Sequence, residues 1–590
     1  MISGTEKQKI ILCKISPDFS DAGDNALPCT LALGLHYIRA YCLQNPAINN
    51  SFDIKIKTFR GQEKTKKIIN SLEKEKPQLV GFSSYDVEYL KTIEVAEAVK
   101  KRLPETKIVV GGPQFYSAEE ELRRHWFIDV AVPFEGELPF EDYLSSIIEG
   151  RAPETVRGIA FRKGGDVRYT GLLTEQVDLK KIPPIYDDEL LDTVSGAIIY
   201  QTSRGCAHRC AFCSSAYDKY REFPLDQVKD DLDRMLSKPK IKRIIFADLD
   251  LAHNAERFKE ILDFLIEHNK RQVLVDGFWS SLPKIEPYIG LMREAGFIRE
   301  FGISMQSGAL KPLKIARRQW LTVEHLRKVA PTIVKHFPDT RVEFILGLPG
   351  ESPESFRESH YAVFECGIRK FLVVDLMVSP GSEFHERRKE LGLEYRDDVS
   401  YRIKSTPDFS EEELQRAREF SKNFQILAWI LQPSDLELYK KWGMNIIDIA
   451  DRIKTLKDYC TDATEMGISF RQVREEAIDV VTELLESECG MARGKVKIIN
   501  EYLHVKYKIY KFERDIKEFY KRQKIEGQLP LIPQFVKMKV SLETLGFLNI
   551  KQSDAEIGRD KKAAIYAIYN PKSDTAVPIT SKLIKLVKSR

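Results

Sequence analysis

The sequence predicts an α/β fold of several domains: an N-terminal Rossmann-like domain, a central partial (β/α)6 TIM-type barrel, and a helical C-terminal extension that ends in a small basic α+β region. Three observations predict it. The chain has 590 residues, several times the size of one domain. Short β-rich runs alternate with helical patterns in two series of different period. A Gly- and Pro-containing connector separates the two series.

The first series covers residues 1–150, which we expect to form the Rossmann-like domain. Its predicted strands are 9–16, 53–58, 78–83 and 107–110, and its predicted helices are 27–43 and 90–103. Such an alternation predicts a parallel sheet with helices on both faces and a ligand site at the carboxyl edge of the strands. Ser83-Ser84, Gly111-Gly112 and Glu135-Gly136-Glu137 are expected along that edge.

A linker, predicted at residues 151–190, contains a hairpin pattern at 158–170. The second series follows at residues 191–385. Its six β-rich runs are 197–201, 243–247, 272–275, 300–304, 342–346 and 371–377. Helix-length segments separate most of these runs. Six consecutive βα units predict a partial barrel, open compared with the eight-unit form.

Residues 386–490 are predicted to be helical. Ser410-x-x-Glu413 and Ser469-x-x-Gln472 are capping-box patterns in front of amphipathic runs. Residues 491–590 combine a Lys- and Tyr-rich helix at 496–524 with a Pro-containing linker and a few weak strands. The aromatic and basic spacing within that helix could contact nucleic acid, although an amphipathic helix packed on the barrel is the favoured interpretation.

Composition limits the class of protein. Hydrophobic residues make up 43% and charged residues 31%, as in soluble globular proteins. No apolar run reaches the length of a membrane helix and no signal peptide is recognisable, so we expect a cytoplasmic protein that does not use a membrane. The net charge of +4 makes nucleic acid an unfavoured partner. The basic residues concentrate after residue 490, either as a solvated surface or as a site for an acidic partner.

Nine cysteines, an odd number, argue against a disulfide framework. Three of them, Cys206, Cys210 and Cys213, lie within eight residues directly after the first strand of the second series. Three thiolates in one loop suit a 4Fe-4S cluster and leave one iron open for a substrate. A zinc site that includes His208 and chance clustering are the alternatives. Cys13, Cys29 and Cys42 are expected to be buried thiols.

The CxxxCxxC spacing, with Phe212 before the third cysteine, resembles the signature of the radical S-adenosylmethionine (radical SAM) superfamily. Further motifs follow in the family's order. This resemblance implies contacts to S-adenosylmethionine from Phe212, Asp248, Ser304, Gln306, Arg318 and Gly347. Asp248 would bind the methionine amino group, Arg318 the carboxylate by bidentate pairing, and Gly347 would let the backbone approach adenine. We expect His208, His253 and His385 to be loop or capping residues.

The N-terminal segment is similar to the cobalamin-binding domain that precedes the barrel in one large class of radical SAM enzymes. The similarity lies in Leu27-Pro28-x-x-Leu31-Ala32 and in the turns after the strands. It implies cobalamin contacts from Ser83, Ser84, Gly111, Gly112, Glu135, Gly136 and Glu137. Glycines at strand ends would let a corrin and its nucleotide tail approach the backbone. The alternative is a Rossmann-like domain that has lost its cofactor.

Together these resemblances imply a cobalamin-dependent radical SAM enzyme that methylates an unactivated carbon of a small-molecule or peptide substrate. A 5′-deoxyadenosyl radical would remove a hydrogen atom and methylcobalamin would supply the methyl group. A reducing electron donor such as flavodoxin or ferredoxin is implied as a partner. The alternatives are a cobalamin-binding enzyme of rearrangement, cyclisation or ring contraction, a tRNA methylthiotransferase, and a non-enzymatic iron-sulfur redox sensor.

Overall fold

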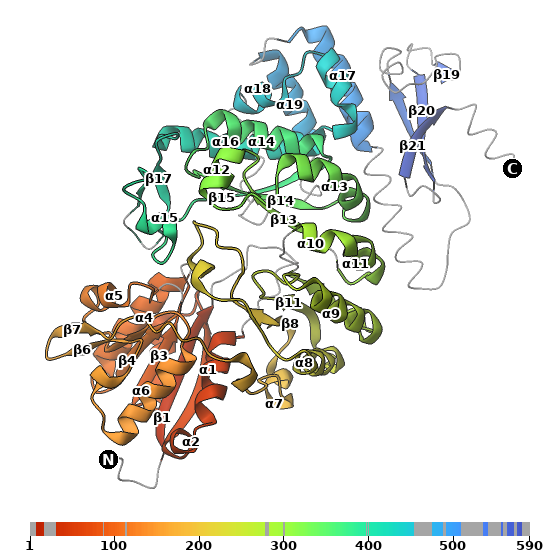
Figure 1. Cartoon of the computed structure of the whole chain (residues 1–590). Helices are drawn as coiled ribbons and strands as arrows, with labels where there is room; N and C mark the ends of the chain where they lie inside the picture. The colour runs from red at the N-terminus through yellow and green to blue at the C-terminus, as the bar shows by residue number, and fades with distance from the viewer. Residues whose placement is uncertain are drawn as a thin grey trace. The chain divides into compact units, whose positions relative to one another are not determined.

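A computed structural model of the chain describes fourteen segments (Figure 1): residues 7–16, 31–85, 88–112, 115–277, 282–298, 301–396, 398, 400–452, 475–487, 491–508, 535–540, 556–557, 563–570 and 575–580. The chain divides into two compact units. Unit 1 comprises Met1–Pro353 and Val373–Leu414, and unit 2 comprises Glu354–Leu372 and Gln415–Arg590. Unit 1 therefore holds the predicted N-terminal domain together with most of the predicted barrel.

The N-terminal domain is built on a seven-stranded sheet in the order β2-β1-β3-β4-β5-β6-β7. Its strands are β1 (Gln8–Ser16), β2 (Phe52–Arg60), β3 (Leu79–Ser83), β4 (Lys107–Gly111), β5 (Val130–Val132), β6 (Ala160–Lys163) and β7 (Asp166–Tyr169). The first five strands are parallel, which confirms the predicted class. The hairpin β6-β7, predicted as part of the linker, instead extends this sheet by antiparallel pairing with β5.

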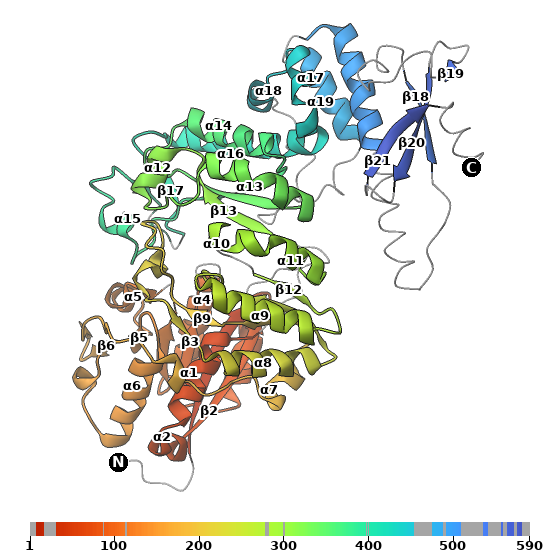
Figure 2. The same cartoon turned by 45° about the vertical axis from the view of Figure 1, so that its right-hand side comes forward.

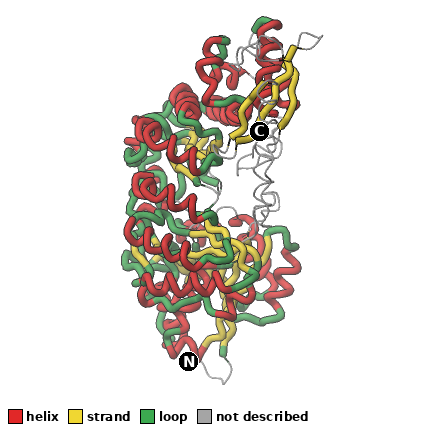
Figure 3. The backbone as a smooth tube through the Cα atoms, turned by 90° about the vertical axis from the view of Figure 1, so that its right-hand side faces the viewer, coloured by secondary structure: helices red, strands yellow, loops and turns green. Residues whose placement is uncertain are grey.

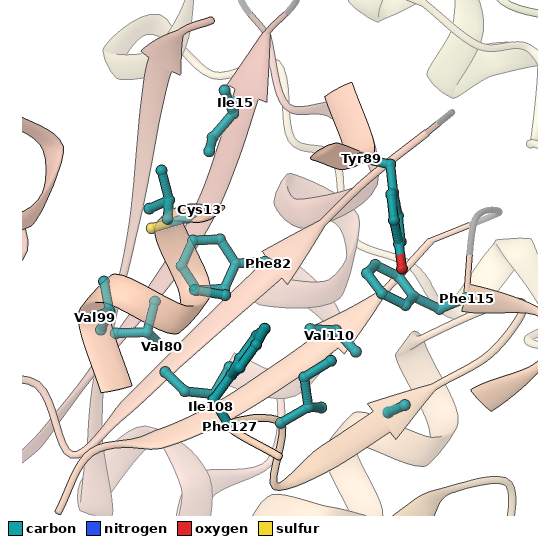
Figure 4. Close-up of a cluster of buried hydrophobic side chains, with 14 of the residues drawn as sticks. Cys13, Ile15, Val80, Phe82, Tyr89, Val99, Ile108, Val110, Phe115 and Phe127 are labelled. Carbon is teal, nitrogen blue, oxygen red and sulfur yellow. The ribbon is translucent and has the colours of Figure 1, made fainter. Parts of the chain in front are cut away.

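Two hydrophobic clusters cover the two faces of this sheet, because successive β1 side chains point to opposite sides. Ile11 and Cys13 pack with α3 (Thr65–Glu73), α4 (Tyr89–Arg102) and α5 (Ala118–Arg124), as Figure 4 shows in part. Ile10 and Leu12 pack against the helices of the other face, which are α1 (Leu33–Leu43), α2 (Pro46–Ser51) and α6 (Glu137–Glu149). Helices therefore lie on both sides of the strands (Figure 3). Cys13 and Cys42 are buried thiols, as predicted, whereas Cys29 lies outside the described residues.

All six predicted barrel strands are present. They are β8 (Gly196–Tyr200), β11 (Ile241–Phe246), β12 (Leu274–Asp276), β13 (Gly302–Gln306), β14 (Arg341–Leu346) and β15 (Lys370–Asp375). Within the described residues they form two three-stranded sheets, β12-β11-β8 and β13-β14-β15, and not one continuous sheet. Figures 1 and 2 show four connecting helices following one another on one side of these strands. They are α8 (Leu225–Ser237), α9 (Ala255–His268), α11 (Ile289–Ala295) and α13 (Val323–His336).

The segment after β15 is less helical than predicted. The short helix α15 (Glu383–Glu386) is followed by the antiparallel ribbon of β16 (Glu394–Tyr395) and β17 (Ile403–Ser405). Strands of two or three residues are too short for a period-2 pattern to reveal. The predicted capping box at Ser410 is confirmed, because its hydroxyl accepts from the Glu413 amide at 3.2 Å and the Glu413 carboxylate accepts from the Ser410 amide at 2.8 Å. The second predicted box, at Ser469, lies outside the described residues.

Unit 2 combines helices with a small antiparallel sheet. The helices that lie wholly or mostly in it are α14 (Pro353–Glu365), α16 (Glu411–Ile430), α17 (Leu436–Lys441), α18 (Ile446–Arg452), α19 (Glu475–Ser487) and a helical run at 493–508. The sheet contains β18 (Phe535–Val540), β19 (Glu556–Ile557), β20 (Ala563–Asn570) and β21 (Thr575–Thr580). Tyr502, on the run at 493–508, is buried, and its ring centroid lies 5.3 Å from that of Trp442. This part of the Tyr- and Lys-rich helix therefore packs within unit 2. None of the helices in the described part of the chain is long and apolar enough to cross a membrane.

Candidate functional site

The three cysteines lie in one loop whose two ends are held together. We call residues 205–220 the cysteine loop. The strands β9 (Ser203–Arg204) and β10 (Arg221–Glu222) pair antiparallel at its base, with Arg204 opposite Arg221. Gly205, at φ +78°, lies so close to the other end of the loop that a Cβ atom would stand 2.2 Å from the Lys219 carbonyl oxygen. Only glycine fits this close approach.

The thiols of the cysteine loop fit an iron-sulfur cluster. All three are free of disulfides, with Cys210 buried and Cys206 and Cys213 half-buried. Burial, together with the nearby Asp250, Cys210 and Cys213, raises the pKa of Cys206 to about 11, which indicates that the three thiols lie near one another. No three His, Cys, Asp or Glu side chains of the described residues converge tightly enough for a single metal ion.

Arg318 is brought to the cysteine loop, as its predicted role requires. Its guanidinium donates to the Cys210 sulfur at 3.3 Å and to the Ser304 carbonyl oxygen at 2.7 Å, and it lies 4.3 Å above the Trp320 ring. A cation is thus fixed between the thiols and the end of β13. The same strand ends in Gln306, which is buried and adopts φ +70°, a strained conformation typical of functional positions. The Ser304 hydroxyl donates to Glu343 at 2.8 Å.

The two aspartates after β11 have different surroundings. The buried Asp248 carboxylate accepts from the Thr202 amide at 3.0 Å, the Thr202 hydroxyl at 2.7 Å and the Ser203 hydroxyl. It therefore fixes the turn between β8 and β9, and its contact to S-adenosylmethionine stays a prediction. Asp250, also buried, interacts with His208 at 2.8 Å.

His208 was expected to be a loop or capping residue. Besides its contact to Asp250, its ring stacks on Trp320, with the ring centroids 4.9 Å apart. These two contacts hold the His208 side chain beside Trp320, whose ring also contacts Arg318. Phe212 lies within the cysteine loop and is half-buried.

Gly347, at φ +89°, is required by packing. A Cβ atom there would lie 2.9 Å from the Ile403 side chain and 3.3 Å from Leu414. The missing side chain therefore makes room for neighbouring apolar side chains of unit 1. Close approach of the backbone to adenine stays a prediction.

The carboxyl edge of the N-terminal sheet is made mainly of backbone. Ser83 pairs with Gly111, and the amide of the buried Ser84 donates to the Gly111 carbonyl at 3.1 Å. A Cβ atom on Gly112, at φ +100°, would stand 2.7 Å from the Ser84 carbonyl oxygen, and one on Gly111 would stand 3.1 Å from the Val132 carbonyl oxygen. A side chain at Gly112 would therefore strike the backbone directly after β3, so packing requires glycine at this position.

The turn Glu135-Gly136-Glu137 packs inside unit 1. Gly136 faces α1, since a Cβ atom there would lie 2.7 Å from the Ile38 side chain. Glu135 and Glu137 accept hydrogen bonds from Arg204, at 3.2 and 2.8 Å. The two carboxylates therefore form ion pairs to the base of the cysteine loop, and the contact of this turn to cobalamin stays a prediction.

Two large side chains in the segment after β3 are exposed. Tyr85, directly after Ser84, is 52% exposed, and Leu90, in the first turn of α4, is 68% exposed. The strand order β2-β1-β3-β4-β5 also places the switch point of the sheet between β1 and β3, where ligands of such sheets bind.

A tyrosine of the N-terminal domain reaches the cysteine loop. Tyr116 follows β4 and lies near Ser214 and Cys213, both of which influence the pKa of its hydroxyl. Its ring also contacts Gly381, where a Cβ atom would lie 3.5 Å away. Burial raises the pKa of Tyr116 to about 12, so the phenol stays protonated at neutral pH. The edge of the N-terminal sheet thus faces the cysteine loop within unit 1.

Sequence reasoning missed four residues of this site: Arg204, Arg221, Tyr116 and Trp320. Two of them left a signal, because Arg204 and Arg221 bracket the cysteine motif and lie opposite each other in the ribbon. Trp320 follows Arg318 by two residues, a spacing with no motif of its own.

Two known families match this chain, one in the N-terminal domain and one in the region of the barrel strands. The B12 binding domain family matches residues 22–144, and the radical SAM superfamily matches residues 200–360. The first match ends in α6, and the second begins at the end of β8 and spans the cysteine loop.

Curated relatives are 25% identical to this chain. One is the cobalamin-dependent radical SAM methyltransferase TokK of Streptomyces tokunonensis, matched over 60% of this chain and 55% of its own length. Another is the 2-(S-pantetheinyl)-carbapenam-3-carboxylate methyltransferase of Streptantibioticus cattleyicolor, matched over 63% of this chain and 57% of its own length. The chain thus spans a little over half the length of these relatives.

Solved structures share the fold at low identity. The cobalamin-dependent S-adenosylmethionine radical enzyme OxsB, solved with aqua-cobalamin and S-adenosylmethionine, matches with a TM-score of 0.56 at 16% identity, over 85% of this chain and 80% of its own. The radical S-adenosylmethionine methyltransferase TsrM from Kitasatospora setae, solved with cobalamin and a [4Fe-4S] cluster, matches with a TM-score of 0.54 at 15% identity, over 73% and 90%.

Proposed function

Since this chain belongs to the radical SAM proteins that carry a B12-binding domain ahead of the radical SAM domain, we propose that it is a cobalamin-dependent methyltransferase acting on an unactivated carbon. Its substrate is a small molecule or a peptide. When bound, the cluster with S-adenosylmethionine supplies a radical that removes a substrate hydrogen, and the cobalamin supplies the methyl group.

The observation that carries the proposal is that the carboxyl edge of the N-terminal sheet lies against the cysteine loop. Within unit 1, Glu135 and Glu137 after β5 bind Arg204 at the base of that loop, and Tyr116 after β4 lies near Ser214. Methyl transfer between two cofactors requires both to reach the same substrate carbon. The contact between the two sites supports the proposal.

In this proposal the chain's own residues bind and orient. Cys206, Cys210 and Cys213 ligate the cluster. Arg318, already fixed against Ser304 and Trp320, pairs with the carboxylate of S-adenosylmethionine.

The B12-binding domain contributes its strand edge. Ser83, Ser84, Gly111 and Gly112 supply the backbone of that edge, and Tyr85 and Leu90 supply apolar surface for the corrin. A low-potential donor such as flavodoxin or ferredoxin delivers electrons.

The test is anaerobic reconstitution of the full chain with iron, sulfide and cobalamin, followed by repurification and incubation with S-adenosylmethionine and a reductant. We expect iron and sulfide near four per chain, corrin absorbance that survives repurification, and 5′-deoxyadenosine as a product. Protein that cleaves S-adenosylmethionine but retains no corrin would contradict the cobalamin-dependent function. Reconstituted protein without iron-sulfur absorbance would contradict the radical SAM chemistry itself.

A further inference from the structure

Four charged side chains join the B12-binding domain to the base of the cysteine loop: Glu135, Glu137, Arg204 and Arg221. We call them the interdomain clamp. We propose that the clamp is a positioning device, which fixes the cysteine loop against the carboxyl edge of the N-terminal sheet and so sets the distance between the two cofactors. The inference rests on the proposed function, and it concerns residues for which the sequence predicted either another role or none.

The clamp is a connected set of hydrogen bonds. Arg204 Nη1 donates to Glu135 Oε1 at 3.2 Å and to Glu137 Oε1 at 2.8 Å. Arg221 Nη1 donates to Glu135 Oε2 at 3.1 Å, and Arg221 Nη2 donates to Glu135 Oε1. Glu135 therefore binds Arg221 in a fork-to-fork arrangement, which adds geometric specificity to the attraction, and it accepts one further bond from Arg204.

The charges explain why the clamp is needed. Arg204 and Arg221 lie directly opposite each other in the β9-β10 ribbon, and like charges in that position repel. Burial alone would raise the pKa of Glu135, but Arg221 and Arg204 hold it below its ordinary value. Glu137 is only 3% exposed. Loss of both carboxylates would leave two half-buried guanidinium groups without an anionic partner in the clamp, which is unfavourable.

Neighbouring groups keep the clamp in place. The Arg204 guanidinium lies 5.2 Å above the Tyr37 ring of α1, and that ring stacks on Phe223, directly after β10, at 5.4 Å. Val177 donates its amide to Glu135 at 3.3 Å and accepts from Arg221 at 2.7 Å. The arginines are therefore held from the N-terminal domain and from the segment that follows its hairpin.

The position of the clamp links both cofactor sites. Arg204 precedes Cys206 by two residues, and Glu137 is the first residue of α6 after the edge turn. A displacement at either end moves the cysteines relative to the strand edge. Small misplacements of reacting groups strongly slow a reaction between two bound partners. The clamp therefore acts on the coupling of the two cofactors, that is, on how many methyl groups are transferred per S-adenosylmethionine cleaved, and not on the binding of either cofactor alone.

The test compares Glu135→Gln/Glu137→Gln with Asp129→Asn. Asp129 is the matched control, because it forms an ion pair of similar burial, to Lys100 at 3.0 Å, inside the N-terminal domain. Hydrogen exchange of the full-length protein is measured over residues 203–222, before and after reconstitution. We expect exchange about tenfold faster in the double variant, since charge-assisted bonds are lost, and unchanged exchange in the control. Equal exchange in the double variant and the wild type would overturn the proposal.

Turnover supplies the second measurement. In the reconstituted double variant we expect wild-type iron content and wild-type affinity for S-adenosylmethionine, with at least tenfold more 5′-deoxyadenosine formed per methyl group transferred. The single variant Glu137→Asp, which keeps both negative charges of the clamp, should retain most of the coupling of the wild type. A parallel loss of cleavage and transfer would show a merely structural role and overturn the proposal. A wild-type enzyme that transfers no methyl group would contradict the proposed function, while the exchange measurement would still test the clamp.

Discussion

The cysteine loop and the carboxyl edge of the N-terminal sheet are built in different ways. In the cysteine loop the chemistry belongs to side chains, namely three thiols and the Arg318 guanidinium at 3.3 Å from Cys210. At the sheet edge the surface is backbone, and its glycines are required by the packing of β3 against β4 and β5. Side chains of special chemistry leave a readable sequence pattern, whereas a backbone surface leaves only glycines, which have several causes.

The largest effect is expected from removal of the three thiols of the cysteine loop. Cys206→Ala/Cys210→Ala/Cys213→Ala should lose all iron and sulfide and all cleavage of S-adenosylmethionine, because no ligand remains for the cluster. The N-terminal domain should stay folded, since it has cores of its own on both faces of its sheet. Metal analysis and circular dichroism check this. Cys366→Ala, a free cysteine of unit 2, is the control, and iron retained by the triple variant would contradict the assignment.

At the carboxyl edge of the N-terminal sheet, we expect a larger side chain to have a steric effect. Gly112→Val should destabilise the protein by about 3 kcal/mol, because it combines a left-handed conformation with a clash at the Ser84 carbonyl. Corrin retention should fall as a consequence of the distorted edge. Thermal unfolding of the variant without cobalamin measures this directly. Gly34→Ala, at a helix position with no atom within 4 Å, should be neutral or stabilising by about 0.5 to 1 kcal/mol. If Gly112→Val unfolds like the wild type, the edge is not constrained by packing.

Arg318 tests a single side chain of the cysteine loop region. Arg318→Ala should weaken binding of S-adenosylmethionine by about 1.5 to 3 kcal/mol, the scale of a charge-assisted contact. Arg317→Ala is the neighbouring control, since Arg317 is 57% exposed and pairs with Glu383 at 2.8 Å. Titration of the reconstituted protein measures both. Equal losses in the two variants would mean that general charge, and not the placement of Arg318, governs binding.

The last prediction concerns the pH dependence of stability and a single buried carboxyl group. Burial raises the pKa of Glu351 to about 8, and its carboxylate accepts from the Ser307 hydroxyl. Between the ordinary pKa near 4.5 and 8, the folded chain keeps a proton that the unfolded chain has released, so stability falls as pH rises, by at most about 1.4 kcal/mol per pH unit. Glu351→Gln should lessen the decline in melting temperature from pH 5 to 8. The exposed Glu354→Gln should follow the wild type, and an unchanged slope in Glu351→Gln would contradict the raised pKa.

The fold and part of the site could be predicted from sequence because they depend on local patterns. Alternating apolar runs indicated β1 to β4 and all six barrel strands, and the cysteine spacing indicated the loop. The clamp could not be predicted, since Glu135 and Arg204 are 69 residues apart and either charge alone is typical of a surface. The hairpin β6-β7 was recognised but assigned to the linker, because nothing local records which strand it joins.

The closed base of the cysteine loop has a consequence for maturation. The β9-β10 pairing and the approach of Gly205 to Lys219 bring the ends of residues 205–220 together as unit 1 folds. The entropy of closing that loop is therefore lost during folding and not during metal uptake. Unlike a zinc finger, which folds only around its ion, this chain would present a prepared acceptor to the assembly machinery.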